Sequence, residues 1–180
     1  MKVHYNLKDL PHFSKGVITT GAFDGVHKGH QQIIGRMKEI AANIGGETII
    51  ITFHPHPRKV TSSIPGEIKQ LTSLNERIIL LEKSGIDHLV VIPFDYQFSN
   101  LSASDYITEF LVAHFHPHTI IVGYDHRFGK GRSGDFELLK NRGLSIGFNV
   151  EQINEQLVDN EIVSSTHIRN YLAEKNIVKA

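Results

Sequence analysis

The chain has 180 residues, a size that suits one domain, and its 19 basic and 19 acidic side chains leave no formal net charge. The absence of cysteine excludes disulfides, cysteine-ligated metal centres and thiol nucleophiles, and the balanced charge argues against a broad nucleic-acid surface or a polybasic membrane anchor. No apolar run approaches the roughly 18 residues of a membrane span, and the first residues lack the pattern of a secretory signal, so we expect a single cytoplasmic domain over residues 1–180.

The first half of the chain alternates short apolar runs with an amphipathic segment. The β-branched run at residues 17–20 predicts a strand that ends at Gly21, and the continuous apolar run at residues 48–53 predicts a strand covered on both faces. Between them, residues 30–44 predict a helix that a Gly-Gly pair ends. The apolar residues on one face of this helix are Ile33, Met37, Ile40 and Ile44.

The second half repeats this alternation. Residues 73–76 have the sequence of a capping box and predict a helix that reaches Lys83. Residues 102–105 predict another capped helix, which carries Tyr106, Phe110, Leu111 and Phe115. The remaining predicted elements are strands at residues 88–92, 119–122 and 145–153, and helices at residues 135–142 and 164–175.

Strands that alternate with helices, and that are buried on both faces, indicate an α/β fold with helices on both faces of a parallel sheet. In such sheets, ligands bind beyond the carboxyl ends of the strands, at the switch point of the strand order. The loops after Thr20, Phe53, Ile92 and Val122 are therefore expected to form the site. These loops are rich in glycine, histidine, aspartate and arginine.

The segment at residues 21–30 follows the first of these strands and leads into a helix. Its glycines allow the backbone to approach a ligand closely, and the helix N-terminus directs unpaired N–H groups toward it. His27 and His30 are three residues apart and converge on the first helical turn. The pattern favours a phosphate site over a plain strand–helix turn with exposed histidines, although it is neither a Walker loop nor a dinucleotide fingerprint.

Five segments together resemble the FMN adenylyltransferase module of bacterial bifunctional riboflavin kinase/FMN adenylyltransferases, which are HxGH nucleotidyltransferases. These segments are residues 21–30, 52–57, 93–102, 122–130 and 163–169, and they span most of the chain. The resemblance implies a Rossmann-like nucleotidyltransferase fold. It also implies that the chain transfers AMP from ATP to FMN, giving FAD and pyrophosphate, by in-line attack of the FMN phosphate on the ATP α-phosphate.

The resemblance also implies a set of site residues. The catalytic residues would be His27, His30 and Arg169. The ATP-binding residues would be Gly21, Ala22, Phe23, Asp24, Gly25, Gly29, Ser164, Ser165 and Thr166. The flavin-binding residues would be His54, Pro55, His56, Phe98, Asp125 and Phe128. Mg²⁺ is expected with ATP, without an identifiable protein ligand. In this arrangement, the starts of two helices lie side by side and bind one polyanion.

Several alternatives stay open. The Ser-Ser-Thr run at residues 164–166 also fits a plain helix cap, Phe98 and Phe128 could fill the edge of the sheet, and His54 with His56 has the spacing of a metal-binding pair. His126 departs from the family motif, which has phenylalanine there. The alternative functions are a sibling adenylyltransferase with another phosphate acceptor, or a flavin- or nucleotide-binding module without turnover. No segment resembles a riboflavin kinase barrel, so that domain is expected to be absent.

Overall fold

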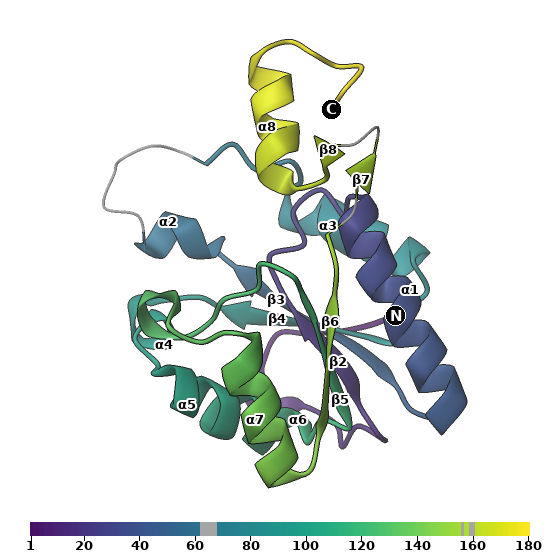
Figure 1. Ribbon diagram of the computed structural model, residues 1–180, viewed down its shortest axis with the longest axis vertical. Helices are drawn as coiled ribbons and strands as arrows, with labels where there is room; N and C mark the ends of the chain where they lie inside the picture. The colour runs from purple at the N-terminus through teal and green to yellow at the C-terminus, as the bar shows by residue number, and fades with distance from the viewer. Residues whose placement is uncertain (62–67, 156, 159–160) are drawn as a thin grey trace.

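The computed structural model of the chain describes residues 1–61, 68–155, 157–158 and 161–180 (Figure 1). Within these residues, six strands form one parallel sheet in the order β1-β4-β3-β2-β5-β6, which confirms the predicted α/β fold. The strands are β1 (Lys2–His4), β2 (Val17–Thr20), β3 (Thr48–His54), β4 (His88–Pro93), β5 (Thr119–Gly123) and β6 (Asn149–Ile153). A separate antiparallel pair consists of β7 (Leu157–Val158) and β8 (Glu161–Ile162).

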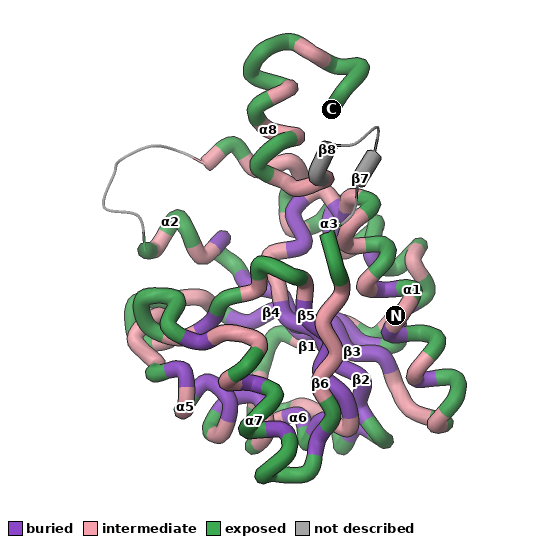
Figure 2. Tube along the Cα trace, in the orientation of Figure 1, coloured by how far each residue is buried: buried purple, intermediate pink, exposed green. Residues whose placement is uncertain are grey.

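Helices cover both faces of the sheet, and the central strands are buried between them (Figure 2). Side chains alternate between the faces, so Ile49 and Ile51 of β3 pack in one apolar cluster and Ile50 packs in the other. Helices α1 (Lys28–Ile44) and α3 (Leu74–Lys83) cover the face with Ile50. The opposite face is covered by α5 (Ala103–Asp105), the π-helix η2 (Tyr106–Val112), α6 (Ala113–Phe115) and α7 (Phe136–Ile146). The other helices are η1 (Leu7–Asp9), α2 (Pro57–Thr61), α4 (Tyr96–Ser99), η3 (Lys130–Arg132) and α8 (Ser165–Ala173).

The predicted caps begin two helices as expected. Ser73 accepts a hydrogen bond from the backbone N–H of Glu76, and the Glu76 carboxylate accepts one from the N–H of Ser73, which completes a capping box. Ser102 accepts a hydrogen bond from the N–H of Asp105 and begins α5. The helix that follows continues as a π-helix, which the spacing of its aromatic residues did not indicate.

The prediction of a strand over residues 145–153 is wrong at its start. Helix α7 continues to Ile146, because Gly147 with a φ of 103° ends it in the left-handed conformation, and β6 begins only at Asn149. Strand β1 was not predicted, because a strand of three residues is too short to show a pattern.

The order of the strands fixes the switch point. The chain runs from β2 to β3 and β4 on one side, then crosses to β5 and β6 on the other, so the switch point lies between β2 and β5. Helix α8 stands beyond the carboxyl ends of these strands (Figure 1). Among the described residues, every helix is too short or too polar to span a bilayer.

Candidate functional site

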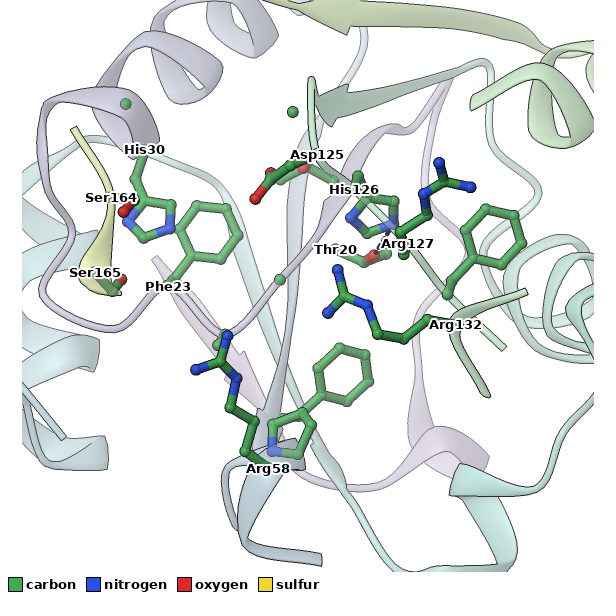
Figure 3. Close-up of a pocket in the computed structure, with 18 of the residues that line it drawn as sticks. Thr20, Phe23, His30, Arg58, Asp125, His126, Arg127, Arg132, Ser164 and Ser165 are labelled. Atoms are coloured by element: carbon green, nitrogen blue, oxygen red, sulfur yellow. Dashed lines mark hydrogen bonds between the residues drawn. The ribbon is translucent and has the colours of Figure 1, made fainter. Parts of the chain in front are cut away.

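A cavity of about 900 Å³ opens at the carboxyl ends of the strands (Figure 3). Its walls come from the loop after β2, from α2, from the loop after β5 and from the start of α8. The predicted site residues that line it are Gly21, Ala22, Phe23, His27, Gly29, His30, His56, Phe98, Asp125, Phe128, Ser164, Ser165, Thr166 and Arg169. The predicted site residues outside its lining are Asp24, Gly25, His54 and Pro55.

Asp24 lies beneath the wall of the cavity. Its carboxylate accepts hydrogen bonds from the backbone N–H groups of Leu71 and Thr72, at 3.0 and 2.9 Å, and forms an ion pair with Arg169. The residue is only 1% exposed. Burial alone would raise the pKa of Asp24, but the hydrogen bonds from Arg169, Leu71 and Thr72 lower it overall. The ionised carboxylate therefore holds protein groups together and does not face the cavity.

The loop that carries Asp24 is tightly coiled. Phe23, Gly25 and Val26 all have a positive φ, between 42° and 84°. A Cβ on Gly25 would lie 2.7 Å from a methyl carbon of Leu71, so this position requires glycine for space as well as for conformation. Gly25 thus allows the loop to pack against the segment before α3.

The N-termini of α1 and α8 lie side by side, as predicted. Ser165 Oγ donates a hydrogen bond to the backbone carbonyl of Asp24 at 2.8 Å, and Arg169, one turn further along α8, pairs with the carboxylate of the same residue. Arg169 Nε also donates to the carbonyl of Lys69 at 3.0 Å. Ser164 caps α8 through its hydroxyl and also lines the cavity. Two helix N-termini therefore border one cavity.

His27 and His30 form a stacked pair at the start of α1. Their ring centroids are 3.7 Å apart, and Phe23 packs against His30 at 4.6 Å. Both Nδ1 atoms are buried without a hydrogen-bond partner among the described residues. Burial lowers the pKa of His27 to about 4, and burial with the neighbouring His27 lowers the pKa of His30 well below its usual value. Both imidazoles are therefore neutral at pH 7 and offer hydrogen bonds rather than positive charge.

Part of the cavity lining is aromatic. Phe98 packs against Phe53 and Phe94 with centroid distances of 5.6 and 5.4 Å, and Phe128 stacks on Tyr106 at 5.1 Å. Phe98 and Phe128 pack with the apolar core and also line the cavity, so they fill the edge of the sheet, and contact with a substrate ring stays a prediction. Their rings provide a surface on which a flat ring can stack.

The last residue of β3 and the two residues that follow it differ in burial. His54 and Pro55 are exposed and lie outside the cavity lining, whereas His56 is 7% exposed and belongs to it. Burial, followed by the charge of Arg169, lowers the pKa of His56 to about 4. His56 Nδ1 accepts a hydrogen bond from the N–H of Arg58 at 3.2 Å. Among the described residues, no three histidine, aspartate or glutamate side chains are arranged to hold a metal, so the metal-pair interpretation has no further ligand.

Several cavity residues were not predicted. His126 Nε2 lies 3.4 Å from Thr20 Oγ1 (Figure 3). Thr20 Oγ1 accepts a hydrogen bond from the Tyr106 hydroxyl at 3.1 Å, so a polar chain crosses the switch point. Burial lowers the pKa of His126 to about 4. Arg58 and Arg132 also line the cavity. The position of Arg58 after a strand could have identified it, but Thr20 reads as an ordinary β-branched strand residue.

Comparison with known proteins identifies the family. The profile of the FAD synthetase family matches residues 10–167, a span that includes both helix N-termini at the cavity. The chain belongs to the FAD synthetase family. This FAD synthetase family member is 34% identical over 179 residues to the bifunctional riboflavin kinase/FMN adenylyltransferase of Escherichia coli strain K12, covering 98% of this chain and 56% of that protein. It is 35% identical over 164 residues to the protein of the same description from Listeria monocytogenes, covering 91% and 52%. The chain thus spans about half the length of the curated relatives that it matches.

Solved structures also resemble this FAD synthetase family member. A crystal structure described as a macrolide-efflux protein from Streptococcus pneumoniae superposes with a TM-score of 0.84 at 25% identity, covering 97% of this chain and 58% of that one. A pantothenate synthetase from Thermus thermophilus superposes with a TM-score of 0.58 at 15% identity, covering 93% and 67%. The second likeness shows the fold alone. Both comparisons agree with the Rossmann-like α/β fold implied by the sequence.

Proposed function

We propose that the chain is an FMN adenylyltransferase, which transfers AMP from ATP to FMN. Membership of the FAD synthetase family supports this proposal, as do relatives whose names include the same activity. The observation that carries it is the lining of the cavity, which combines two helix N-termini with aromatic rings. The helix N-termini suit a polyphosphate, and the aromatic rings suit the flat ring of a flavin.

In the proposed reaction, an oxygen of the FMN phosphate attacks the α-phosphorus of ATP. The bond between that phosphorus and the oxygen that bridges to the β-phosphate breaks, and pyrophosphate leaves with the electron pair. The transfer needs two anions held in line, and stabilisation of the charge that develops on pyrophosphate, but no protein nucleophile. Positioning alone can supply about 7–11 kcal/mol of such a barrier.

We assign the phosphate groups of ATP to the two helix N-termini that border the cavity. Backbone N–H groups of α1 and α8 would bind them, and neutral His27 and His30 would donate hydrogen bonds to phosphate oxygens. Arg169 would supply positive charge, since its pairing with Asp24 leaves other N–H donors of the guanidinium available. Ser165 would contribute its backbone N–H, because its hydroxyl donates to the backbone of Asp24.

The place of each remaining residue relative to the cavity decides whether we assign it to the flavin or to a supporting role. His56, Phe98, Asp125 and Phe128 would contact the flavin, since all of them line the cavity. Asp24 is assigned as a positioning residue, because its carboxylate fixes Arg169 and its carbonyl fixes α8. Gly25 allows the loop to pack against Leu71. His54 ends β3 and Pro55 follows it, and neither has a proposed substrate contact. These assignments replace the substrate contacts predicted for Gly25, His54 and Pro55.

The proposal includes Mg²⁺ as a companion of ATP. The ion would bind to the phosphates and neutralise part of their charge. Because Arg169 and backbone N–H groups occupy the Asp24 carboxylate, we assign no ligand of the first loop to the ion. We also propose that the protein acts in the cytoplasm on small molecules and does not bind nucleic acid.

Incubation of the protein with ATP, Mg²⁺ and FMN tests the proposal, with chromatography for FAD and pyrophosphate as the readout. Formation of both products would support it. Parallel incubations replace FMN with pantetheine phosphate or nicotinamide mononucleotide. A product from either acceptor, and none from FMN, would indicate a sibling adenylyltransferase. Binding of ATP and FMN without any product would indicate a binding module.

A further inference from the structure

Arg77 is a buried arginine that has few partners. It lies on α3, is 0% exposed and is among the largest side chains in the core. Its Nη1 donates a hydrogen bond to Thr52 Oγ1 at 3.2 Å, whereas its Nε and Nη2 are buried without a partner among the described residues. Because a guanidinium carries five N–H donors and stays charged in proteins, most of its hydrogen-bonding capacity is unmet.

Arg77 also lacks an ion pair with a carboxylate among the described residues. Asp24 is the acid that acts on it, and Asp24 is already paired with Arg169. A buried cation without a partner destabilises the folded state, and an apolar side chain of similar volume often stabilises it. The presence of this arginine in the core therefore points to a role other than folding.

The contacts of Arg77 connect it with the part of the cavity that we assign to the polyphosphate. Thr52 Oγ1, which accepts the bond from Arg77, donates to the carbonyl of Ala22 at 3.2 Å, and Ala22 lines the cavity. Burial is the main cause of the lowered pKa values of His30 and His56, and the charge of Arg77 lowers them further. The charge thus acts on two side chains of the cavity wall.

The distribution of unmet hydrogen bonds supports the same connection. Among the described residues, the buried side-chain atoms without a partner all belong to His27, His30 and Arg77. Buried polar groups in folded proteins are nearly always paired, so a local group of exceptions requires an explanation. A bound anion next to this wall would supply the negative charge that the wall lacks.

We propose that Arg77 is a positioning residue for the phosphate groups of the bound nucleotide. It braces Ala22 through Thr52, and its uncompensated positive charge favours a polyanion in the cavity. Arg77 does not touch the ligand, since it lies outside the cavity lining. The inference rests on the proposed function of this cavity, because it takes the polyphosphate of ATP as the ligand.

Calorimetric titration of ATP into the wild type, Arg77→Met and Arg77→Lys tests this proposal without FMN. Arg77→Met removes the charge and keeps a long side chain, so we expect the Kd for ATP to rise about tenfold. The melting temperature should stay the same or rise, and in the full reaction the KM for FMN should not change. Arg77→Lys keeps a basic group, but burial lowers the pKa of a lysine more readily than that of an arginine, so its Kd for ATP should lie between those of the wild type and Arg77→Met.

Leu81→Met is a matched control for repacking. Leu81 lies one turn further along α3 and is 0% exposed, and the substitution nearly conserves its volume, so ATP affinity should not change. Equal ATP affinity in Arg77→Met and the wild type would overturn the proposal. An Arg77→Met protein that does not fold would also overturn it, as would an Arg77→Lys protein that binds ATP more weakly than Arg77→Met. A wild type that binds ATP but makes no FAD would contradict the proposed function and leave this comparison intact.

Discussion

Two pairs of stacked histidines lie in different parts of the molecule and differ in their hydrogen bonding. Where β1 pairs with β4, His4 Nε2 is 3.0 Å from His88 Nδ1, and His88 Nε2 is 3.3 Å from a carboxylate oxygen of Glu47. At the start of α1, His27 and His30 stack with both Nδ1 atoms buried and unpartnered among the described residues. The first pair forms hydrogen bonds within the protein, whereas each histidine of the second pair has a ring nitrogen without a hydrogen-bond partner among the described residues. Unmet hydrogen bonding therefore distinguishes a site from a core, whereas burial of histidine alone does not.

Replacing one histidine of each pair gives the largest expected effect. His30→Ala removes an imidazole that we place against developing negative charge, so turnover in FAD formation should fall about 10²-fold or more. His88→Ala removes a ring that is 4% exposed and bonded on both sides, so it should lower the melting temperature more than His30→Ala does and leave the turnover of folded protein unchanged. Steady-state kinetics and thermal melts measure the two effects. Wild-type turnover in His30→Ala would remove His30 from the mechanism.

Two arginines allow a similar comparison, because Arg169 lines the cavity and Arg36 forms an ion pair on the surface. Arg169 binds Asp24 and the carbonyl of Lys69, so Arg169→Lys cannot reproduce its fork and should lower kcat/KM for ATP about tenfold. Arg36 binds both carboxylate oxygens of Glu151, at 2.7 and 3.0 Å, on the exposed side of α1. Arg36→Lys is the control and should stay within about twofold of the wild type in activity, since surface ion pairs contribute little. Equal effects of the two variants would argue against a phosphate-binding role for Arg169.

The elements that the sequence predicts best are those with a strong local pattern. Strands β2 and β3 are β-branched or apolar runs buried on both faces, and the start of α3 is a capping box. The sequence pattern of each of these elements lies within the element itself and does not depend on distant residues. The first loop and the start of α8 were predicted to meet because motifs of one family mark both. The cavity brings these two segments together.

The residues that the sequence describes poorly depend on tertiary contacts. Asp24 reads as a ligand-facing acid in its motif, but the segment at Leu71 and the start of α8 bury it. Arg77 follows Asn75 and Glu76 on a capped helix and reads as a surface arginine from its residue type, yet α3 turns it into the core. Helical spacing does place Arg77 on the face that carries Leu74 and Leu81, but spacing does not give the partners of a buried charge, so both roles became visible only in three dimensions.

The neutral histidines of the cavity make the fold sensitive to acid. The folded pKa values of His27, His56 and His126 are lowered to about 4, whereas an unfolded histidine has a pKa of about 6.5. Below about pH 6.5 the unfolded state binds protons that the folded state does not, so the free energy of unfolding should fall as the pH drops toward about 4. Each such histidine contributes at most about 1.4 kcal/mol per pH unit. Urea unfolding across this range measures the slope, and a pH-independent free energy would contradict the neutral assignment.

His126→Phe is expected to have the smallest effect on FAD formation, because the imidazole of His126 makes only one weak hydrogen bond with the described residues. Its bond to Thr20 is long, at 3.4 Å, and Thr20 keeps the hydrogen bond from Tyr106 when the imidazole is removed. A phenylalanine ring can retain the contact with Phe128, whose centroid is 5.9 Å away, so FAD formation should stay within about threefold of the wild type.

The same variant also measures how much His126 contributes to the loss of stability at low pH. At about pH 5 the wild type loses stability because unfolded His126 binds a proton and folded His126 does not, and the variant lacks this loss. The melting temperature of His126→Phe relative to the wild type should therefore be higher at about pH 5 than at about pH 8. The pH 8 measurement is the control, since it contains the change in packing without the proton. An equal difference at both pH values would mean that folded His126 accepts a proton as readily as the unfolded residue.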